Sequence, residues 1–412
     1  MKLATCLCLT TAALALASPV LADCGIDKGS VRILSNDFPA LGVVNAAAEA
    51  CASPTVTVTR NQTSEHQSLQ VPALTSNPAI YSVAVVANDS VVPLLNAGLI
   101  RPLDDLVAAY AQTLQPSQLV KIDGKVMAIA LQINAQHLWL RPDILEQAGI
   151  TTQPKTYEDV LAAAEAIRGK GILEHPLAAA DKPGWNLAAE FVNMYMGYGG
   201  ELFEPGTAEV SIENDKGVKA LETMKALTAY MDPDFITYDT NAMQAVWQSG
   251  EAAIENAWGS RGAGVLDPAG KAPEVGAKTV FAGAPTVGGG TVPASTLWWD
   301  GFTIAKNASD EDAAASFRAM VHAIGPETAK ANPTVAAWLI PGYEPTPAAK
   351  GVIETLKAGA KPYPMVPTMG ILHTALGDNL IGYLQGSESV EQALADATKA
   401  YETAAKEAGF LN

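Results

Sequence analysis

Short apolar runs alternate with amphipathic segments along most of the chain. Residues 31–34, 56–59 and 82–86 are rich in β-branched and aliphatic side chains, which predicts buried strands. Segments 156–169 and 309–324 carry apolar residues at helical spacing, and each begins with a Thr or Ser that can cap the first turn. A chain in which such strands and helices alternate is typical of an α/β fold.

The first 22 residues have the pattern of a cleaved export signal. A basic residue follows the initiating Met, residues 3–17 are almost wholly apolar or small, and residues 20–22 offer small or aliphatic side chains for cleavage. The apolar stretch is shorter than the roughly 20 residues of a membrane-spanning helix, and no later stretch is long enough either. We therefore expect a soluble mature chain that is secreted into the periplasm. The alternative, a lipid anchor on Cys24, would need a small residue where Asp23 stands.

Two cysteines, Cys24 and Cys51, lie outside this signal. An exported protein meets an oxidising compartment, so one disulfide between them is the simple prediction. The alternative is that both are unpaired small residues of the core.

The composition is acidic and contains enough apolar residues for a large core. The chain has 43 Asp and Glu against 26 Lys and Arg, a net charge of −17, and 49% hydrophobic residues. Its length leaves room for two domains with separate cores. A negative surface repels phosphate backbones and anionic lipids, which argues against nucleic acids and membrane surfaces as partners.

No catalytic, cofactor or metal motif stands out. The chain has no G-x-S-x-G elbow and no P-loop, and Gly262 and Gly264 lack the third Gly of a dinucleotide motif because Asp267 stands there. Its five His residues show no metal-ligand spacing. We therefore expect a protein that is not an enzyme and that has no cofactor and no metal.

The aromatic residues are more informative. Seven Trp residues are spread along the chain. Trp185, Trp258 and Trp299 adjoin Gly, Asn or Asp, which places them on loops, whereas Trp139 and Trp247 lie in apolar context and are expected in the core. A flat indole can pack on the C–H face of a sugar ring while nearby polar groups bind the hydroxyls. The three loop Trp residues are therefore candidate ligand contacts.

Polar residues follow each of the three predicted strands. Asn36 and Asp37 follow the first strand, Asn88 and Asp89 follow the third, and Glu65 and His66 begin the segment after the second. Ligands in open α/β sheets bind at the carboxyl ends of strands, so these six residues are candidate contacts as well. A solvated turn or a helix cap would explain each of them equally.

Several segments follow the order and spacing of a known family. They are residues 123–126 (DGKV), 132–136 (QINAQ), 142–150 (PDILEQAGI), 156–160 (TYEDV), 198–203 (YGGELF), 247–254 (WQSGEAAI), Trp258, 301–304 (GFTI) and 389–394 (SVEQAL). Together they resemble the family 1 extracellular solute-binding proteins, which are the maltose-binding-protein-like receptors of ABC importers. The likeness covers nearly the whole chain after the signal.

The resemblance implies an α/β, two-lobed periplasmic binding protein fold of the type II kind. Each lobe would be a β-sheet flanked by helices, and hinge strands would join the lobes. The expected first lobe is residues 23–133 plus 301–343, and the expected second lobe is residues 134–300 plus 344–412, after a signal peptide of residues 1–22.

The same resemblance implies a ligand site and a partner. The implied ligand contacts are Trp185, Trp258, Trp299, Asp300, Asn134 and His373. Hinge closure on a small polar solute, here a carbohydrate or polyol, would produce the form that the membrane permease subunits of an ABC transporter recognise. The protein is expected to be a monomer.

Two other functions stay open at this point. A receptor of the same fold could bind a cation such as a polyamine, because Trp faces and carboxylates suit a cation as well as a sugar. A periplasmic enzyme could act on saccharides through two carboxylates of the cleft. Salt-dependent binding would favour the first alternative, and product formation would favour the second.

Overall fold

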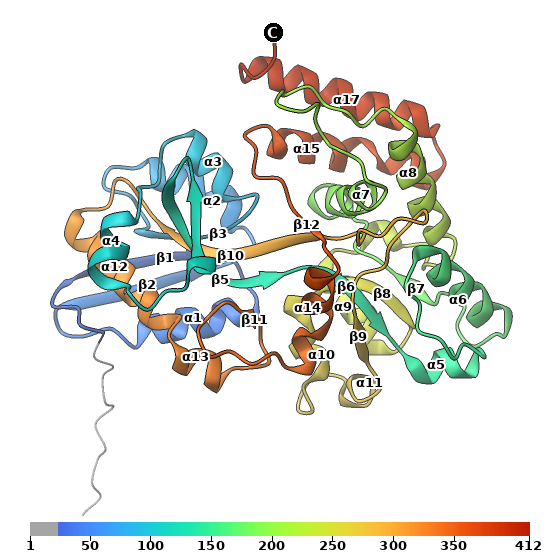
Figure 1. Cartoon of the computed structure of the whole chain (residues 1–412), viewed down its shortest axis with the longest axis horizontal. Coiled ribbons are helices and arrows are strands. Elements are labelled where there is room, and N and C mark those ends of the chain that lie inside the picture. Colours follow the sequence, from blue (N-terminus) through green and yellow to red (C-terminus); the bar gives the residue numbers. More distant parts are fainter. Residues whose placement is uncertain (1–23) are drawn as a thin grey trace, which may run out of the picture.

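The computed structural model describes residues 24–412. The predicted export signal, residues 1–22, lies outside the described residues. Figure 1 shows two lobes, each built on its own β-sheet with helices around it. Within the described part of the chain, no helix has both the length and the apolar character that crossing a bilayer requires.

The first lobe is built on an eight-stranded mixed sheet, which includes one short strand from the segment 344–412 that was expected in the second lobe. Its main strands have the spatial order β11-β5-β10-β3-β1-β2, with β4 paired to β5 and β12 paired to β10. Their bounds are β1 (Gly29–Ser35), β2 (Val56–Gln62), β3 (Val83–Ala87), β4 (Leu119–Ile122), β5 (Lys125–Asn134), β10 (Thr296–Ile304), β11 (Ala337–Trp338) and β12 (Lys361–Pro362). Strand β1 is parallel to β2 and β3, whereas β10 is antiparallel to β3 and β5. The carboxyl ends of β1, β2 and β3 therefore lie at one edge of the sheet.

Six α-helices and one 3₁₀ turn complete the described part of the first lobe. They are α1 (Pro39–Glu49), α2 (His66–Thr75), α3 (Val91–Asn96), α4 (Asp104–Tyr110), η1 (Pro116–Gln118), α12 (Asp310–Ala323) and α13 (Pro326–Ala331). Val31, Ile33, Phe302 and Phe317 belong to one buried hydrophobic core between this sheet and its helices.

The second lobe contains a four-stranded sheet in the order β7-β8-β6-β9. Its strands are β6 (Gln136–Leu140), β7 (Leu177–Ala178), β8 (Ile254–Trp258) and β9 (Val280–Ala282). The α-helices are α5 (Pro142–Gln147), α6 (Tyr157–Gly169), α7 (Trp185–Gly197), α8 (Asp215–Thr228), α9 (Thr240–Ser249), α10 (Gly262–Leu266), α11 (Pro273–Gly276), α14 (Lys350–Lys357), α15 (Met369–Asn379), α16 (Ile381–Gln385) and α17 (Val390–Glu407). The 3₁₀ turns are η2 (Phe235–Thr237), η3 (Gly259–Arg261) and η4 (Pro347–Ala349). A core separate from that of the first lobe fills this one.

The predicted local elements are present. Residues 31–34, 56–59 and 82–86 form or overlap β1, β2 and β3. The start of α6 is a capping box, in which Thr156 Oγ1 accepts the N–H of Asp159 at 3.0 Å and the Asp159 carboxylate accepts the N–H of Thr156 at 3.1 Å. Such a cap contributes about 1 kcal/mol to helix stability. The predicted core residues Trp139 and Trp247 are both 0% exposed, which confirms that assignment.

The chain passes between the two lobes at three places within residues 24–412. Strand β5 of the first sheet continues through Ala135 into β6 of the second. Strand β10 brings the chain back, and residues 339–346 lead from β11 to η4 and α14, which packs on β6 and β9. Figure 1 shows β5 and β10 running between the lobes. The exact limits of the lobes stay a prediction.

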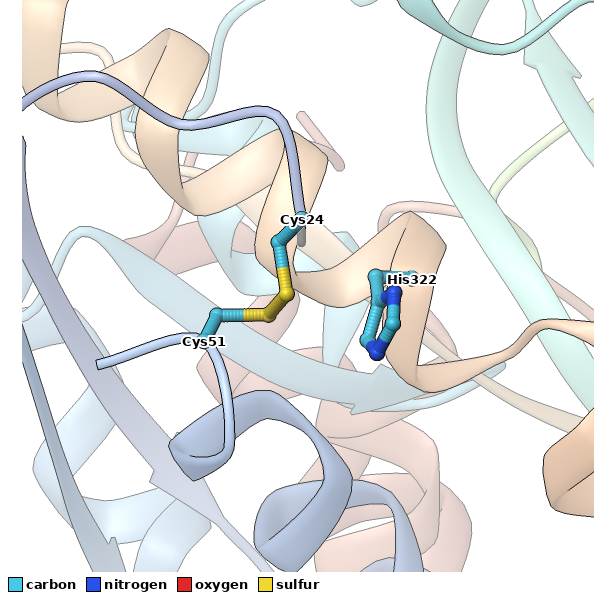
Figure 2. A group of neighbouring side chains, drawn as sticks. All are labelled: Cys24, Cys51 and His322. Carbon is cyan, nitrogen blue, oxygen red and sulfur yellow. A yellow bond between two sulfur atoms is a disulfide. The ribbon is translucent and has the colours of Figure 1, made fainter. Parts of the chain in front are cut away.

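The predicted disulfide is confirmed. Cys24 and Cys51 are bonded, with their Cα atoms 5.6 Å apart, so the bond ties the first described residue to the segment just after α1 (Figure 2). The two sulfur atoms and a ring nitrogen of His322 on α12 lie within 4.8 Å of one another. Because the sulfur atoms are bonded to each other, this group does not present the thiolates that a metal ion would need.

Candidate functional site

A cavity of about 140 Å³ lies between the lobes, beside the strands that connect them. Its walls come from both lobes and from the connecting strands. The first lobe contributes Asn36, Phe38, Leu41, His66, Gln67, Val85, Val86, Ala87 and Asp89. The second lobe contributes Trp185, Thr240, Trp258, Ser260 and Arg261, and the connecting strands contribute Asn134, Trp298 and Asp300.

One wall of the cavity is aromatic. The ring centroids of Trp185 and Trp298 are 5.6 Å apart, those of Trp258 and Trp298 are 5.6 Å apart, and those of Trp185 and Trp258 are 6.0 Å apart. Tyr363 packs behind Trp298 at a centroid distance of 4.1 Å. Because the three indoles pack on one another, they form a single rigid apolar surface on one side of the cavity.

Local structure explains how the three Trp residues come together. Trp258 ends β8, and Trp185 begins α7 directly after Gly184, whose positive φ of 96° turns the chain into the helix. Trp298 lies near the start of β10, opposite Asn134 on β5. Side chains alternate along a strand, so Trp298 and Asp300 both line the cavity while Trp299 between them packs against the first-lobe core.

The first lobe contributes polar as well as apolar residues to the lining. Because β1, β2 and β3 are parallel, the residues that follow them meet at one edge of the sheet. Asn36, His66 and Asp89 reach the cavity in this way. Burial lowers the pKa of His66, and the negative charge of Asp89 opposes this effect. The Asp89 carboxylate accepts hydrogen bonds from Gln67 Nε2 and from Trp185 Nε1, each at 2.9 Å.

Asp300 places a second carboxyl group in the cavity. Its Oδ2 accepts a hydrogen bond from Gln132 Nε2 at 2.7 Å. Removal from water raises the pKa of Asp300 to about 7, the hydrogen bond from Gln132 opposes that rise, and the charge of Asp89 adds to it. A carboxyl group in this state can accept a hydrogen bond from a ligand hydroxyl and, when protonated, can donate one.

Arg261 is the basic residue that lines the cavity among the described residues. Its guanidinium is half-buried and makes no ion pair within the part of the chain that the structure describes. Burial lowers its pKa, while Asp37 and Asp239 raise it. The cavity thus contains two carboxyl groups and one guanidinium, whose charges balance when Asp300 is protonated.

Comparison with known proteins places the chain in a family. The sequence profile of the bacterial extracellular solute-binding proteins matches residues 44–321, which is more than half of the 412 residues. The chain belongs to this family. This confirms the resemblance on which the fold and the site were predicted.

Individual relatives of this solute-binding protein are distant. A probable ABC transporter-binding protein of Deinococcus radiodurans is 25% identical over 193 residues, which is 45% of this chain and 44% of that protein. A probable sugar-binding periplasmic protein of Rhizobium meliloti is 25% identical over 142 residues, which is 34% of this chain and 33% of that protein. The chain therefore spans less than half the length of the curated relatives that it matches.

Solved structures confirm the two-lobed fold. A maltose-bound MalE3 of T. maritima has a TM-score of 0.79 and 18% identity, and the match covers 91% of this chain and 99% of that one. A solute-binding protein of Agrobacterium vitis with bound D-mannitol has a TM-score of 0.76 and 18% identity, and the match covers 93% of this chain and 100% of that one. At this level of identity the likeness concerns the fold.

Seven of the twelve residues proposed from the sequence line the cavity. They are Asn36, His66, Asp89, Asn134, Trp185, Trp258 and Asp300. The amide of Asn134 is already engaged, because its Nδ2 donates to Ser260 Oγ at 3.1 Å and its Oδ1 accepts the N–H of Ser260 at 3.1 Å. It therefore holds η3 in place beside the cavity.

The other five proposed residues do not line the cavity; they are Asp37, Glu65, Asn88, Trp299 and His373. Glu65 is exposed at the start of α2. Asn88 is 1% exposed, and its side chain accepts the N–H of Trp299 at 2.8 Å and donates to the carbonyl of Tyr363 at 3.3 Å. Asn88 thus clamps two segments near the lobe connections. His373 is buried and lies behind Trp185, to whose backbone carbonyl it is bonded at 2.9 Å.

The sequence predictions missed several residues that line the cavity. They are Gln67, Thr240, Ser260, Arg261 and Trp298. A signal existed for Trp298, because the strand alternation in the run from Trp298 to Asp300 requires Trp298 and Asp300 to share a face. The other four carried no local signal, because they reach the cavity only through the packing of the lobes.

Proposed function

We propose that this protein is the periplasmic substrate-binding component of an ABC importer and that it captures a small carbohydrate or polyol between its lobes. The observation that carries the proposal is the cavity between the lobes, which is lined by three Trp residues and by hydrogen-bonding groups. Aromatic rings pack on the C–H face of a sugar, and carboxylate, amide and guanidinium groups bind its hydroxyls.

The ligands of structurally similar proteins support this substrate class. Proteins of the same fold have been solved with D-mannitol, ribitol, α-D-tagatose and maltose bound. The curated relative of Rhizobium meliloti is described as a probable sugar-binding periplasmic protein.

The proposed mechanism is hinge closure. Residues 23–133 plus 301–343 would move as one lobe, and residues 134–300 plus 344–412 would move as the other, about the strands that connect them. A ligand that contacts both walls binds the closed form better than the open form and shifts the population towards it. The permease subunits would then recognise the closed form.

The charge of the cavity favours a neutral ligand over a polyamine. Arg261 lines the cavity, and its positive charge would repel a polycation. The two carboxyl groups, Asp89 and Asp300, already accept hydrogen bonds from protein groups. When Asp300 is protonated, the charge of Asp89 is matched by that of Arg261, which suits a neutral sugar better than a polycation.

A ligand screen tests the proposal. The mature chain is heated with D-mannitol, ribitol, D-tagatose, maltose or spermidine, and its melting temperature is recorded. A ligand at about 100 times its dissociation constant stabilises the folded state by about 2.7 kcal/mol, so a sugar or polyol should raise the melting temperature. Calorimetry and product analysis should then show binding without turnover. A shift with spermidine alone, or with none of the sugars and polyols, would contradict the proposal.

A further inference from the structure

A hydrogen bond joins the two lobes directly across one side of the cavity. Trp185 Nε1 at the start of α7 donates to Asp89 Oδ2 at 2.9 Å. Asp89 follows β3 of the first sheet, and Trp185 packs against the core of the second lobe. Both residues also line the cavity, so their hydrogen bond is part of its wall.

The first-lobe partner is held in place from two sides. Asp89 Oδ1 accepts the N–H of Ser90 at 2.6 Å, and Asp89 Oδ2 accepts a hydrogen bond from Gln67 Nε2 at 2.9 Å. The carboxylate therefore presents a fixed, negatively charged acceptor to the indole N–H. A hydrogen bond to a charged acceptor is roughly twice as strong as one between neutral groups.

The second-lobe partner is held just as firmly. The Trp185 carbonyl can only accept, so it takes a hydrogen bond from His373 Nε2 at 2.9 Å. Burial lowers the pKa of His373, and with its proton on Nε2 the neutral ring can accept the Tyr363 hydroxyl at Nδ1, at 2.7 Å. The N–H of Gly184 donates to the carbonyl of Gly377 on α15 at 2.9 Å, and a Cβ on Gly377 would collide with Gly184. The indole ring itself packs on Trp258, Trp298 and His373, so it has little freedom to move aside.

The size of the cavity and this hydrogen bond both bear on the length of the ligand. At about 140 Å³ the cavity is smaller than the 300 Å³ or so at which sites for drug-sized ligands begin. A chain of sugar rings would have to leave the cavity somewhere along its edge. On the side formed by Trp185 and Asp89 it would have to break a charge-assisted hydrogen bond between two immobilised groups.

We propose that the hydrogen bond between Trp185 and Asp89 latches the two lobes and restricts this protein to ligands of a single sugar ring or one open-chain polyol. This inference rests on the proposed function and narrows its substrate class. Trp185 then has two roles, because its ring forms part of the aromatic wall and its N–H determines specificity.

The test begins with ligand length. Calorimetry on the wild-type protein compares D-mannitol, ribitol and D-tagatose, which are single-unit probes, with maltose, which has two rings. At least one single-unit probe should bind, and maltose should not. If the wild type binds maltose as tightly as a single-unit probe, the proposed limit on ligand length is wrong, but the proposed receptor function is not. Binding of no sugar or polyol would overturn the proposed function, and this inference with it.

Variants then separate the latch from the wall. Trp185→Phe retains an aromatic ring without its N–H and should bind the best single-unit probe about tenfold more weakly, since the lost bond to a charged acceptor corresponds to at least that factor. Trp185→Phe and Trp185→Ala both lack the hydrogen bond to Asp89, so both should admit maltose; Trp185→Ala also removes one ring of the aromatic wall. Trp299→Phe is the matched control, because this Trp lies on a connecting strand outside the cavity, and it should leave both affinities unchanged. Unchanged affinity in Trp185→Phe would overturn the latch.

A double-mutant cycle and a shape measurement complete the test. If Asp89 acts through Trp185, combining Asp89→Asn with Trp185→Phe should cost no more affinity than the larger single effect, whereas additive losses would show that Asp89 acts independently. Small-angle X-ray scattering of the ligand-free protein should show a larger radius of gyration in Trp185→Phe than in the wild type. Equal radii would contradict the latch without reference to any ligand. Circular dichroism confirms that each variant is folded.

Discussion

A buried carboxyl group in the second lobe should make the protein less stable as the pH rises. Asp181 is 3% exposed and lines a small internal cavity together with Glu190. No hydrogen bond or ion pair to its carboxylate is found among the described residues. Burial alone raises the pKa of Asp181 from 3.8 to about 7. The same burial, reinforced by the charge of Asp181, raises the pKa of Glu190.

The size and sign of the effect follow from proton linkage. Between about pH 4 and pH 7 the folded chain retains a proton on Asp181 that the unfolded chain has already released, so the free energy of unfolding falls as the pH rises. Each pKa unit corresponds to about 1.36 kcal/mol, which makes the total loss from Asp181 on the order of 4 kcal/mol. Asp181→Asn is neutral at every pH and should avoid this loss.

Urea unfolding of the wild type and of Asp181→Asn at several pH values measures the effect. The two proteins should be almost equally stable near pH 4, and the variant should be more stable by several kcal/mol near pH 8. Asp378→Asn, which changes an exposed carboxylate on α15, is the control and should shift stability by less than about 0.5 kcal/mol at either pH. A difference between wild type and Asp181→Asn that does not depend on pH would refute the reasoning.

Three further predictions concern the connections, the aromatic wall and the disulfide. Asn88→Ala leaves the N–H of Trp299 without its hydrogen-bond partner and should lower the free energy of unfolding by about 1–3 kcal/mol, measured in urea. An unchanged urea midpoint would show that the Asn88 side chain does not hold the two segments together. Trp258→Ala removes one ring of the cavity wall and should weaken binding of the best sugar or polyol about tenfold or more in calorimetry, whereas full affinity would show that this ring is not a contact. Cys24→Ser removes the disulfide between Cys24 and Cys51, which are 27 residues apart, and should lower the free energy of unfolding by about 3 kcal/mol. Stability equal to that of the wild type would show that the disulfide does not stabilise the folded chain.

Local sequence patterns were sufficient for the elements and for the class of fold. The strands β1, β2 and β3 were predicted from β-branched runs, and α6 was predicted from a Thr cap with Asp159 three residues on. These features depend on interactions within a few residues, and the sequence displays them directly. The disulfide was predictable because two cysteines remained outside the export signal. The ordered motifs of the family then extended these local elements to a two-lobed architecture.

The site itself was only partly predictable, because side-chain direction depends on how strands pair and how the lobes pack. The alternation along β10 requires that either Trp299 or its neighbours face the cavity, but only the pairing of β10 with β3 and β5 decides in favour of Trp298 and Asp300. The same holds for the Asn88-Asp89 pair, in which the first residue is buried as a clamp and the second reaches the cavity. His373 resembled a ligand contact in the sequence, yet the packing of α15 places it behind Trp185. Sequence alone thus determined which segments approach the site, and only the tertiary structure decided which side chains face it, since the cavity is assembled from segments that are far apart in the chain.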